Sequence, residues 1–210
     1  MKTILCYGDS NTYGFNPKTM GRYSASERWT GILAEKLGKE YKVIEEGLNG
    51  RTTVFDRPEA SWKNGKPYLL PCLLSHKPLD YVVIMLGTND CNSNLNLSSD
   101  DIAGGMEVLI KLVLEDAKEF LPYLPKLIVV APAPILPDYH GSVFAADLDD
   151  YSVKKSEELA EKYKALANKY SCSFIDCSGK VEVSKIDSEH LTEAGHQTLA
   201  ELIYNEIAAN

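Results

Sequence analysis

Three residue types that can work together in hydrolysis occur at the two ends of this sequence. Ser10 follows a short apolar run near the start, and Asp187 precedes His190 by three residues near the end. A serine hydroxyl becomes a good nucleophile when a neighbouring base accepts its proton. His190 can be that base, and Asp187 can fix its tautomer and stabilise the imidazolium that forms. The residue types and spacing therefore indicate acyl transfer through a covalent intermediate on Ser10.

Such a reaction also needs hydrogen-bond donors for the oxyanion of its tetrahedral intermediate. The backbone N–H groups of Ser10 and Gly50 and the side-chain amide of Asn89 are suitable, and each lies in a polar turn. Glycine at position 50 also lets the backbone approach a substrate closely. These three groups are therefore candidate donors for an oxyanion hole.

An alternation of strands and helices provides the elements that must position these residues. Strands are predicted at residues 4–7, 41–46, 80–86, 126–131 and 173–176. Helices are predicted at residues 29–37, 150–170 and 193–208, with a short one at 68–76 that breaks at Pro71. A further long helix is capped by Ser98 or Ser99 and runs to about Leu121. Residues 51–65 and 132–148 are predicted as loops.

This alternation predicts an α/β fold, a flavodoxin-like three-layer α/β/α sandwich with a five-stranded parallel sheet. The sequence shows no internal repeat or linker, so residues 1–210 are predicted to form a single domain. In open parallel sheets, ligands bind beyond the carboxyl ends of the strands, where the strand order reverses. The turns at 8–11, 47–50 and 87–90 are therefore expected to meet at the site.

The composition argues against several classes of partner. Acidic residues number 30 and basic residues 22, which gives a net charge of −8 and disfavours binding to nucleic acid or anionic membranes. The sequence contains no run of about 18 apolar residues, so a membrane span is not expected. The first apolar run is too short for a signal peptide, so a cytoplasmic protein is expected. The five dispersed cysteines fit that compartment better than a disulfide framework.

No metal or other cofactor is expected. The one close cysteine pair, Cys172 and Cys177, lacks further ligands at metal-binding spacing, and acidic pairs such as Glu45-Glu46 are typical of solvated faces. Candidate substrate-binding residues are Asn11, Tyr13, Trp62 and Cys91, which lie in or beside the predicted site loops. The aromatic ones can equally pack beneath their own loops.

Simpler roles for some of these residues stay open. Ser10 alone is also typical of a plain turn or helix cap, so its catalytic role depends on the other motifs. Asp9 is predicted to hydrogen-bond the turn that presents Ser10, and Asp90 to brace its own loop. His190 has the best-placed upstream aspartate of the four histidines, the others being His76, His140 and His196.

Taken together, the motifs resemble those of the SGNH hydrolases, the superfamily of GDSL-type esterases and lipases. The four family blocks stand in order as Gly8-Asp9-Ser10-Asn11, Gly50, Gly87-Thr88-Asn89-Asp90 and Asp187-Ser188-Glu189-His190. The resemblance implies the SGNH fold, a Ser10 nucleophile, a triad completed by Asp187 and His190, and an oxyanion hole of Ser10, Gly50 and Asn89. Position 11 is Asn where the family more often has Leu, which we expect to alter packing or the pocket rim.

A narrower resemblance points to a bacterial arylesterase and acyltransferase subgroup. It rests on residues 4–10, 28–31, 43–48, 51–53 and 84–90. It implies hydrolysis of short-chain esters, from acetyl to butyryl, and in some members acyl transfer to alcohols or hydrogen peroxide. It also implies a homo-oligomer, since a known member is an octamer. The match weakens at residues 91–96 and 135–151, which would shape the pocket and the oligomer contacts.

Other functions remain as alternatives. A carbohydrate acetylesterase would use the same machinery on an acetylated sugar. A non-catalytic carbohydrate-binding protein on this fold would have no need of Ser10, His190 and Asn89 together. A phosphate- or flavin-binding domain is disfavoured because the first turn lacks both the P-loop and the dinucleotide-binding glycine patterns. The G-x-S-x-G elbow of other α/β hydrolases is missing as well.

Overall fold

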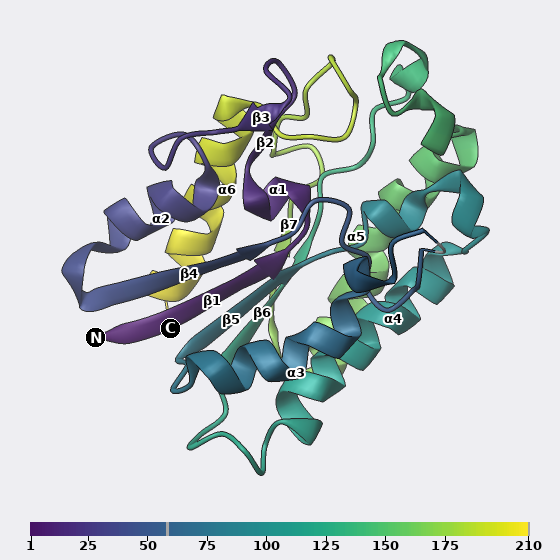
Figure 1. Ribbon diagram of the computed structural model, residues 1–210. Helices are drawn as coiled ribbons and strands as arrows, with labels where there is room; N and C mark the ends of the chain where they lie inside the picture. Colours follow the sequence, from purple (N-terminus) through teal and green to yellow (C-terminus); the bar gives the residue numbers. More distant parts are fainter. Residues whose placement is uncertain (58, 210) are drawn as a thin grey trace.

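The computed structural model describes residues 1–57 and 59–209 (Figure 1). Its main sheet contains β1 (Lys2–Gly8), β4 (Tyr41–Gly47), β5 (Tyr81–Met85), β6 (Lys126–Ala131) and β7 (Ser173–Asp176). All neighbours pair in parallel, in the order β4-β1-β5-β6-β7. The predicted five-stranded parallel sheet is therefore confirmed.

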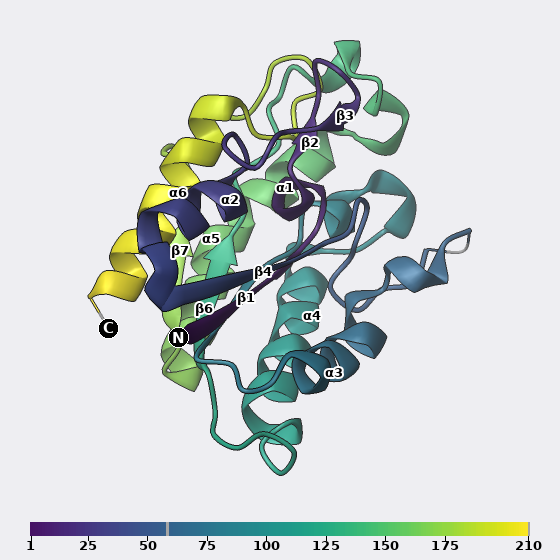
Figure 2. The same cartoon turned by 60° about the vertical axis from the view of Figure 1, so that its left-hand side comes forward.

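Helices cover both faces of this sheet. The helices α2 (Trp29–Leu37) and α6 (Glu193–Ala208) lie on one face, and α3 (Gly65–His76), α4 (Ser99–Lys111) and α5 (Asp150–Tyr170) lie on the other (Figures 1 and 2). The three-layer α/β/α arrangement is the predicted one, with α2, α5 and α6 at the predicted residues. No helix in the described part of the chain is both long enough and apolar enough to cross a lipid bilayer.

Side chains of the central strands alternate between two apolar clusters. In β1, Ile4 and Cys6 pack with α2 and α6, whereas Leu5 and Tyr7 pack with α3, α4 and α5. The same alternation runs along β5 and β6. A parallel strand covered on both faces needs an apolar side chain at every position, which explains the uninterrupted apolar runs in the sequence.

The prediction for α3 was wrong at Pro71, because the helix continues through this residue and begins earlier, at Gly65. A proline inside a helix removes one backbone hydrogen bond, here to the carbonyl of Pro67. Both prolines lie on the exposed side of α3, where water can satisfy that carbonyl. The opposite side buries Leu69 and Leu73 in the core, and this packing outweighs the local preference.

Three further elements differ from the prediction. The helix α4 ends at Lys111 and passes into a π-helical turn, η5 (Leu112–Asp116), well before the predicted end at Leu121. Its start is as predicted, since Ser98 is the N-cap residue and forms a capping box with Asp101. A short helix, α1 (Ser10–Tyr13), occupies the first predicted turn, and a small antiparallel ribbon, β2 (Phe15–Asn16) with β3 (Gly21–Arg22), follows it.

Short 3₁₀ helices occur within the loops. They are η1 (Gly38–Glu40), η2 (Ser61–Lys63), η3 (Asn89–Cys91), η4 (Ser93–Leu95), η6 (Tyr139–Gly141) and η7 (Ala145–Asp147). Five of them, η2, η3, η4, η6 and η7, follow the carboxyl ends of β4, β5 and β6 along the chain. They give defined backbone to loops that the sequence pattern left without structure.

The strand order reverses at β1. From β1 the chain first adds β4 on one side and then returns to add β5 on the other. Gly8 at the end of β1 pairs with Gly47 of β4 and with Met85 of β5, so the three strands end at the same level. The turns that follow β1, β4 and β5 therefore meet at the switch point, where a ligand site is expected.

Candidate active site

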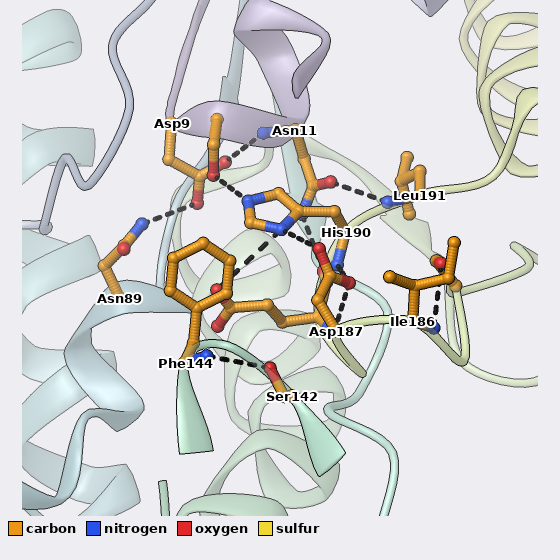
Figure 3. A network of polar contacts seen from close by, with 12 residues as sticks. Asp9, Asn11, Asn89, Ser142, Phe144, Ile186, Asp187, His190 and Leu191 are labelled. Atoms are coloured by element: carbon orange, nitrogen blue, oxygen red, sulfur yellow. Dashed lines mark hydrogen bonds and ion pairs between the residues drawn. The ribbon is translucent and has the colours of Figure 1, made fainter. Parts of the chain in front are cut away.

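Ser10, His190 and Asp187 form a continuous chain of hydrogen bonds. The Oγ of Ser10 lies 2.8 Å from Nε2 of His190, and Nδ1 of His190 lies 2.8 Å from Oδ2 of Asp187. The N–H of His190 also donates to Oδ1 of Asp187 at 3.1 Å, which fixes the carboxylate against the ring. Figure 3 shows the His190 ring between Asp187 and the turn that carries Asp9 and Asn11. The structure thus brings together all three predicted catalytic side chains.

The helix α1 presents Ser10 at its first position. Its N-cap residue is Asp9, whose Oδ1 accepts a hydrogen bond from the N–H of Asn11 at 2.9 Å. The helix crosses the end of β4 so closely that a Cβ atom at Gly47 would lie 2.1 Å from the nitrogen of Tyr13. Only glycine permits this approach. The first N–H groups of a helix have no intrahelical acceptor, so the N–H of Ser10 is available to a ligand.

The loop between β7 and α6 carries both Asp187 and His190. Ser188 lies between them with a left-handed φ of 68°. Its N–H donates to the carbonyl of Ser184 at 2.8 Å, and its hydroxyl donates to the carbonyl of Asp138 at 3.0 Å. The N–H of Ser184 in turn donates to the carbonyl of His190 at 2.7 Å. These bonds connect the two ends of the loop and keep the Asp187 carboxylate beside the His190 imidazole.

Asn11 connects this loop to the turn that carries the serine. Its Nδ2 donates to the carbonyl of Glu189 at 3.1 Å, and its Oδ1 accepts from the N–H of Leu191 at 3.0 Å. Its own carbonyl accepts from the indole N–H of the buried Trp29 at 3.1 Å. Asn11 therefore fixes the backbone on both sides of His190.

The predicted oxyanion donors lie around Ser10. Gly50 has a left-handed φ of 79°, and among the described residues no acceptor pairs with its N–H or with that of Ser10. The Nδ2 of Asn89 donates to the carbonyl of Arg51 at 3.2 Å and to Oδ2 of Asp9 at 3.4 Å. These bonds orient the amide, and the longer one is weak enough to be exchanged for an oxyanion.

Asp90 ties the loop after β4 to the turn after β5. Its carboxylate accepts from the N–H of Thr53 at 3.0 Å and from the Thr53 hydroxyl at 2.5 Å. Burial raises the pKa of Asp90 to about 6, although the bonds from Thr53 oppose that rise. The contact fixes the segment that contains Gly50 relative to Asn89, so Asp90 braces a neighbouring loop, whereas the sequence had suggested that it braces its own.

Two opposing effects set the pKa of His190. Burial lowers it, but the hydrogen bond with Asp187 and the nearby charges of Glu189, Asp187 and Asp9 raise it more, so that it lies above its ordinary value. The rings of Phe15 and Phe144 pack against the imidazole, with centroids 4.4 and 5.6 Å away. A base held in this way accepts a proton readily and cannot swing away from Ser10.

Two other carboxyl groups near His190 titrate close to neutral pH. Glu189 has Oε1 3.8 Å from Nδ1 of His190, and burial raises the pKa of Glu189 to about 7. Burial likewise raises the pKa of Asp9 to about 6. Both carboxyl groups are therefore more readily protonated than ordinary surface carboxylates.

A cavity of about 320 Å³ opens onto Ser10 and His190. Its apolar walls are Phe15, Met20, Phe144 and Leu148, and its polar walls are Asn49, Gly50, Arg57, Lys63, Thr88, Asn89, Asn92, Asp147 and Glu189. Ligand pockets usually measure about 300–1,000 Å³, so this one suits a small molecule. The candidate nucleophile, base and oxyanion donors thus share one small cavity.

The four predicted substrate-binding residues do not line this cavity. Asn11 is buried and holds the His190 loop, as described above. The ring of Tyr13 stacks on the guanidinium of Arg22 at 4.4 Å, and Cys91 is fully buried in the core. Trp62 is 69% exposed and lines a separate cavity of about 560 Å³. Nearness in sequence to the catalytic motifs therefore did not predict which side chains reach the cavity.

Several cavity residues had no signal in the sequence. Phe144 and Leu148 come from the proline-rich loop at 132–148, which has no periodicity to predict which side chains face inward. Lys63 and Arg57 come from the polar loop after β4. Glu189 did have a signal, because it lies inside the motif that contains the base.

One group of described residues has donor types that could hold a metal ion. The donor atoms of Glu46, Cys72 and His76 lie within 4.8 Å of one another, outside the walls of the Ser10 cavity. His76 Nε2 already pairs with Glu46 Oε1 at 3.0 Å, and burial raises the pKa of the Cys72 thiol to about 12. A metal would need the thiolate, so these residues fit a hydrogen-bonded His–Glu pair beside a neutral thiol better than an ion site.

Comparison with known proteins places the chain among esterases. The model of the GDSL-like Lipase/Acylhydrolase family matches residues 6–198, while no curated protein sequence matches. Est24, a carbohydrate acetylesterase from Sinorhizobium meliloti, is 39% identical with a TM-score of 0.91, and the match covers 100% of this chain and 99% of that one. The native aryl esterase of M. smegmatis is also 39% identical, with a TM-score of 0.92 and the same coverage.

A structure from Veillonella parvula, described as a member of the lipolytic protein G-D-S-L family, is 16% identical with a TM-score of 0.72 over 100% of both chains, and it shares the fold alone. The family match spans nearly the whole chain, and the two more similar structures are esterases by their descriptions. The parallel sheet and its surrounding helices are those of the SGNH hydrolase fold. The chain therefore belongs to the GDSL-like lipase/acylhydrolase family and is a carboxylic ester hydrolase.

Proposed function

We propose that the protein is a serine esterase that hydrolyses short-chain acyl esters, acetyl to butyryl, through an acyl-enzyme on Ser10. The observation that carries this proposal is the unbroken relay from Asp187 through His190 to Ser10, with two distances of 2.8 Å, opening onto one small cavity. Three oxyanion donors are available beside the same serine.

In the first half-reaction, Ser10 Oγ attacks the ester carbonyl carbon while His190 Nε2 accepts the hydroxyl proton. Asp187 stabilises the imidazolium and stays ionised. The carbonyl oxygen becomes an oxyanion, which accepts hydrogen bonds from the N–H groups of Ser10 and Gly50 and from Asn89. The tetrahedral intermediate collapses as His190 gives its proton to the leaving alcohol oxygen, which leaves the acyl group on Ser10.

In the second half-reaction, an acceptor hydroxyl attacks the acyl-enzyme. His190 accepts the proton of that hydroxyl and gives it to Ser10 Oγ as the second tetrahedral intermediate collapses, which releases the acyl group joined to the acceptor oxygen and restores Ser10. Water as acceptor gives hydrolysis. An alcohol or hydrogen peroxide would give acyl transfer, which we include in the proposal because the aromatic rings of Phe15 and Phe144 make one side of the cavity apolar. We also propose that the protein forms a homo-oligomer, as the resemblance to the arylesterase and acyltransferase subgroup implies.

The size of the cavity supports a short acyl group. A volume of about 320 Å³ must hold both the acyl chain and the alcohol part of the ester. Leu148 and Met20 bound the cavity on its apolar side, and a long acyl chain would need an extended apolar groove. We therefore expect activity to fall as the chain grows beyond butyryl.

An acetylated carbohydrate is a second candidate substrate. Many of the cavity walls are polar and could bond to hydroxyl groups, among them Asn49, Asn89 and Asn92. Est24, which resembles this chain over its whole length, is described as a carbohydrate acetylesterase. A sugar acetate would present its acetyl group to Ser10 and its hydroxyls to these amides.

The proposal can be tested with a panel of p-nitrophenyl esters, from acetate to laurate, by steady-state and stopped-flow kinetics. Wild type should show a burst and prefer acetate or butyrate, and Ser10→Ala should lose the burst while keeping its circular dichroism spectrum. Ser75→Ala, an exposed serine on α3, is the matched control. Near-wild-type turnover by Ser10→Ala would refute the proposed mechanism. A Ser10-dependent activity on acetylated xylose but on none of the aryl esters would favour the carbohydrate substrate.

A further inference from the structure

Lys63 lies directly against one of the oxyanion donors. Its side chain crosses the face of Gly50, where a Cβ atom would lie 2.8 Å from Nζ and 3.0 Å from Cδ of the lysine. Both residues line the cavity that contains Ser10. The ammonium group is therefore part of the wall that surrounds the ester carbonyl.

The backbone of Lys63 is fixed to the same loop. Its N–H donates to the carbonyl of Ala60 at 3.0 Å, and its carbonyl accepts from the N–H of Thr52 at 3.0 Å. Thr52 is fully buried, and Lys63 itself is half-buried. These bonds fix the backbone of Lys63 beside Thr52, and the side chain extends from there across Gly50 to the cavity wall.

Within the part of the chain that the structure describes, the other charged groups of the cavity have partners, and Lys63 has none. Arg57 lies 3.8 Å from the carboxylate of Asp147 and 3.4 Å from that of Glu59. Glu189 lies beside the His190 imidazole. Across residues 1–57 and 59–209, no carboxylate or carbonyl is paired with Lys63 Nζ. The ammonium is therefore free to form a charge-assisted hydrogen bond with a carboxylate of a bound ligand.

We propose that the ester bound at this site carries a carboxylate that pairs with Lys63 while its carbonyl carbon lies at Ser10. This inference rests on the proposed esterase function and names its substrate class as carboxylate-bearing esters. The oxyanion already has three donors, in Ser10, Gly50 and Asn89, so the ammonium is not needed for that charge. The protein's net charge of −8 would not attract an anionic substrate from a distance, so such a substrate needs a local cation, which Lys63 provides.

The carboxylate can belong to either half of the ester. His190 must protonate the leaving oxygen, so the alcohol part lies on the side of Phe15 and Phe144, which pack on that ring. Lys63 comes from the loop of Gly50, on the oxyanion side, which a substituted acyl group can reach. A bulky aryl alcohol could also extend to it across a cavity of about 320 Å³. The test below separates the two arrangements.

Two matched pairs of esters measure this preference. Monophenyl succinate and phenyl butyrate differ in a carboxylate on the acyl group, and 4-acetoxybenzoate and its methyl ester differ in one on the alcohol group. In one of the two pairs, wild type should favour the charged ester. The ratio of kcat/KM for the charged ester to that for the neutral ester should be about 10-fold higher in wild type than in the Lys63→Gln variant. The loss in Lys63→Gln should come mainly through KM, and on the charged ester it should exceed the loss on the neutral ester of the same pair by about 10-fold. Lys63→Arg should keep part of the preference.

The controls separate this inference from the esterase proposal. Lys66→Gln changes an exposed lysine in the first turn of α3 and should leave all four rates as in wild type. Equal losses on charged and neutral esters in Lys63→Gln would assign the lysine to oxyanion stabilisation and overturn the inference. An unchanged ratio in Lys63→Gln, or no preference in wild type for either charged ester, would overturn it as well. If Ser10-dependent turnover of the neutral esters persists, the esterase proposal survives that result, whereas no turnover of any ester would refute both.

Discussion

Asn11 and His190 are joined by a two-sided clamp. The amide of Asn11 bonds to the carbonyl of Glu189 and to the N–H of Leu191, which are the residues immediately before and after His190. About 180 residues of sequence separate the two partners. The residue next to the proposed nucleophile therefore determines where the base lies, and the distance between Ser10 and His190 depends on it.

We expect Asn11→Ala to lower kcat by about 10- to 100-fold with little change in KM, because a small displacement of the base is costly in the transition state. Steady-state kinetics on p-nitrophenyl acetate measure both constants. Asn168→Ala, on the exposed side of α5, is the control. A rise in KM with kcat intact would show instead that Asn11 contacts the substrate.

Asp187→Asn should reduce turnover by about 10⁴-fold while leaving substrate binding nearly unchanged. The amide cannot stabilise the imidazolium and favours the wrong tautomer of His190. Single-turnover kinetics separate the acylation rate from binding. The loop bonds of Ser188 and Ser184 do not involve the Asp187 side chain, so the fold should persist, and a less than 10-fold effect would argue against the role of this carboxylate.

The acidic limb of the pH profile should move in Glu189→Gln. His190 must be unprotonated to act as a base, and its pKa lies above the ordinary 6.5 because carboxylates oppose the effect of burial. Wild-type kcat/KM should therefore fall with a midpoint above pH 6.5. Glu189 contributes to that rise from 3.8 Å, so removing its charge should shift the midpoint to lower pH.

Glu193→Gln is the matched control for this experiment. Glu193 is an exposed residue in the first turn of α6, and its salt bridge with Lys18 is long, at 3.9 Å. The pH profile of kcat/KM for Glu193→Gln should coincide with that of wild type. A Glu189→Gln midpoint equal to or above that of wild type would contradict the assignment of Glu189 to the electrostatics of the base.

The stability of the fold should depend on pH through His196. Burial lowers the pKa of His196 to about 3, and its Nδ1 accepts from the N–H of Trp29 at 3.3 Å. The unfolded chain takes up a proton near pH 6.5, whereas the folded chain does not until about pH 3. This contribution to stability is therefore present at neutral pH and is lost as the pH falls through that window, at up to about 1.4 kcal/mol per pH unit.

His196→Gln should flatten this dependence. Urea denaturation at a series of pH values from 7 to 4 gives the free energy of unfolding of each protein. Relative to the variant, wild type should lose stability on acidification, and His140→Gln, in an exposed position, should behave as wild type. Parallel curves for wild type and His196→Gln would show that His196 is protonated in the folded state as well.

Most of the fold was predictable because local pattern and packing agree. The residues of β5 and β6 face helices on both sides, so their sequence is apolar throughout, and the caps at Ser98 and Gly38 mark helix ends. The prediction failed where packing overrides local preference, as at Pro71, or where an α-helix changes to π geometry after Lys111.

The reacting groups could be located from sequence, whereas the pocket could not. Ser10, Asn89 and His190 follow their strands or lie in short motifs, and the switch point brings such turns together. Side chains such as Phe144 and Lys63 reach the cavity from loops whose paths depend on contacts far away in the chain. For the same reason, Asn11 was taken for a substrate contact, although its partners lie about 180 residues away.

The hydrogen bond from the Trp29 indole to the carbonyl of Asn11 makes Trp29 an intrinsic fluorescent probe of the active site. The sequence has two tryptophans, of which Trp29 is fully buried and Trp62 is 69% exposed. In a Trp62→Phe background, all tryptophan emission would come from Trp29, whose indole is hydrogen-bonded to α1, the helix that carries Ser10. Acylation of Ser10, or loosening of that helix, would then be visible as a change in fluorescence with substrates that carry no chromophore.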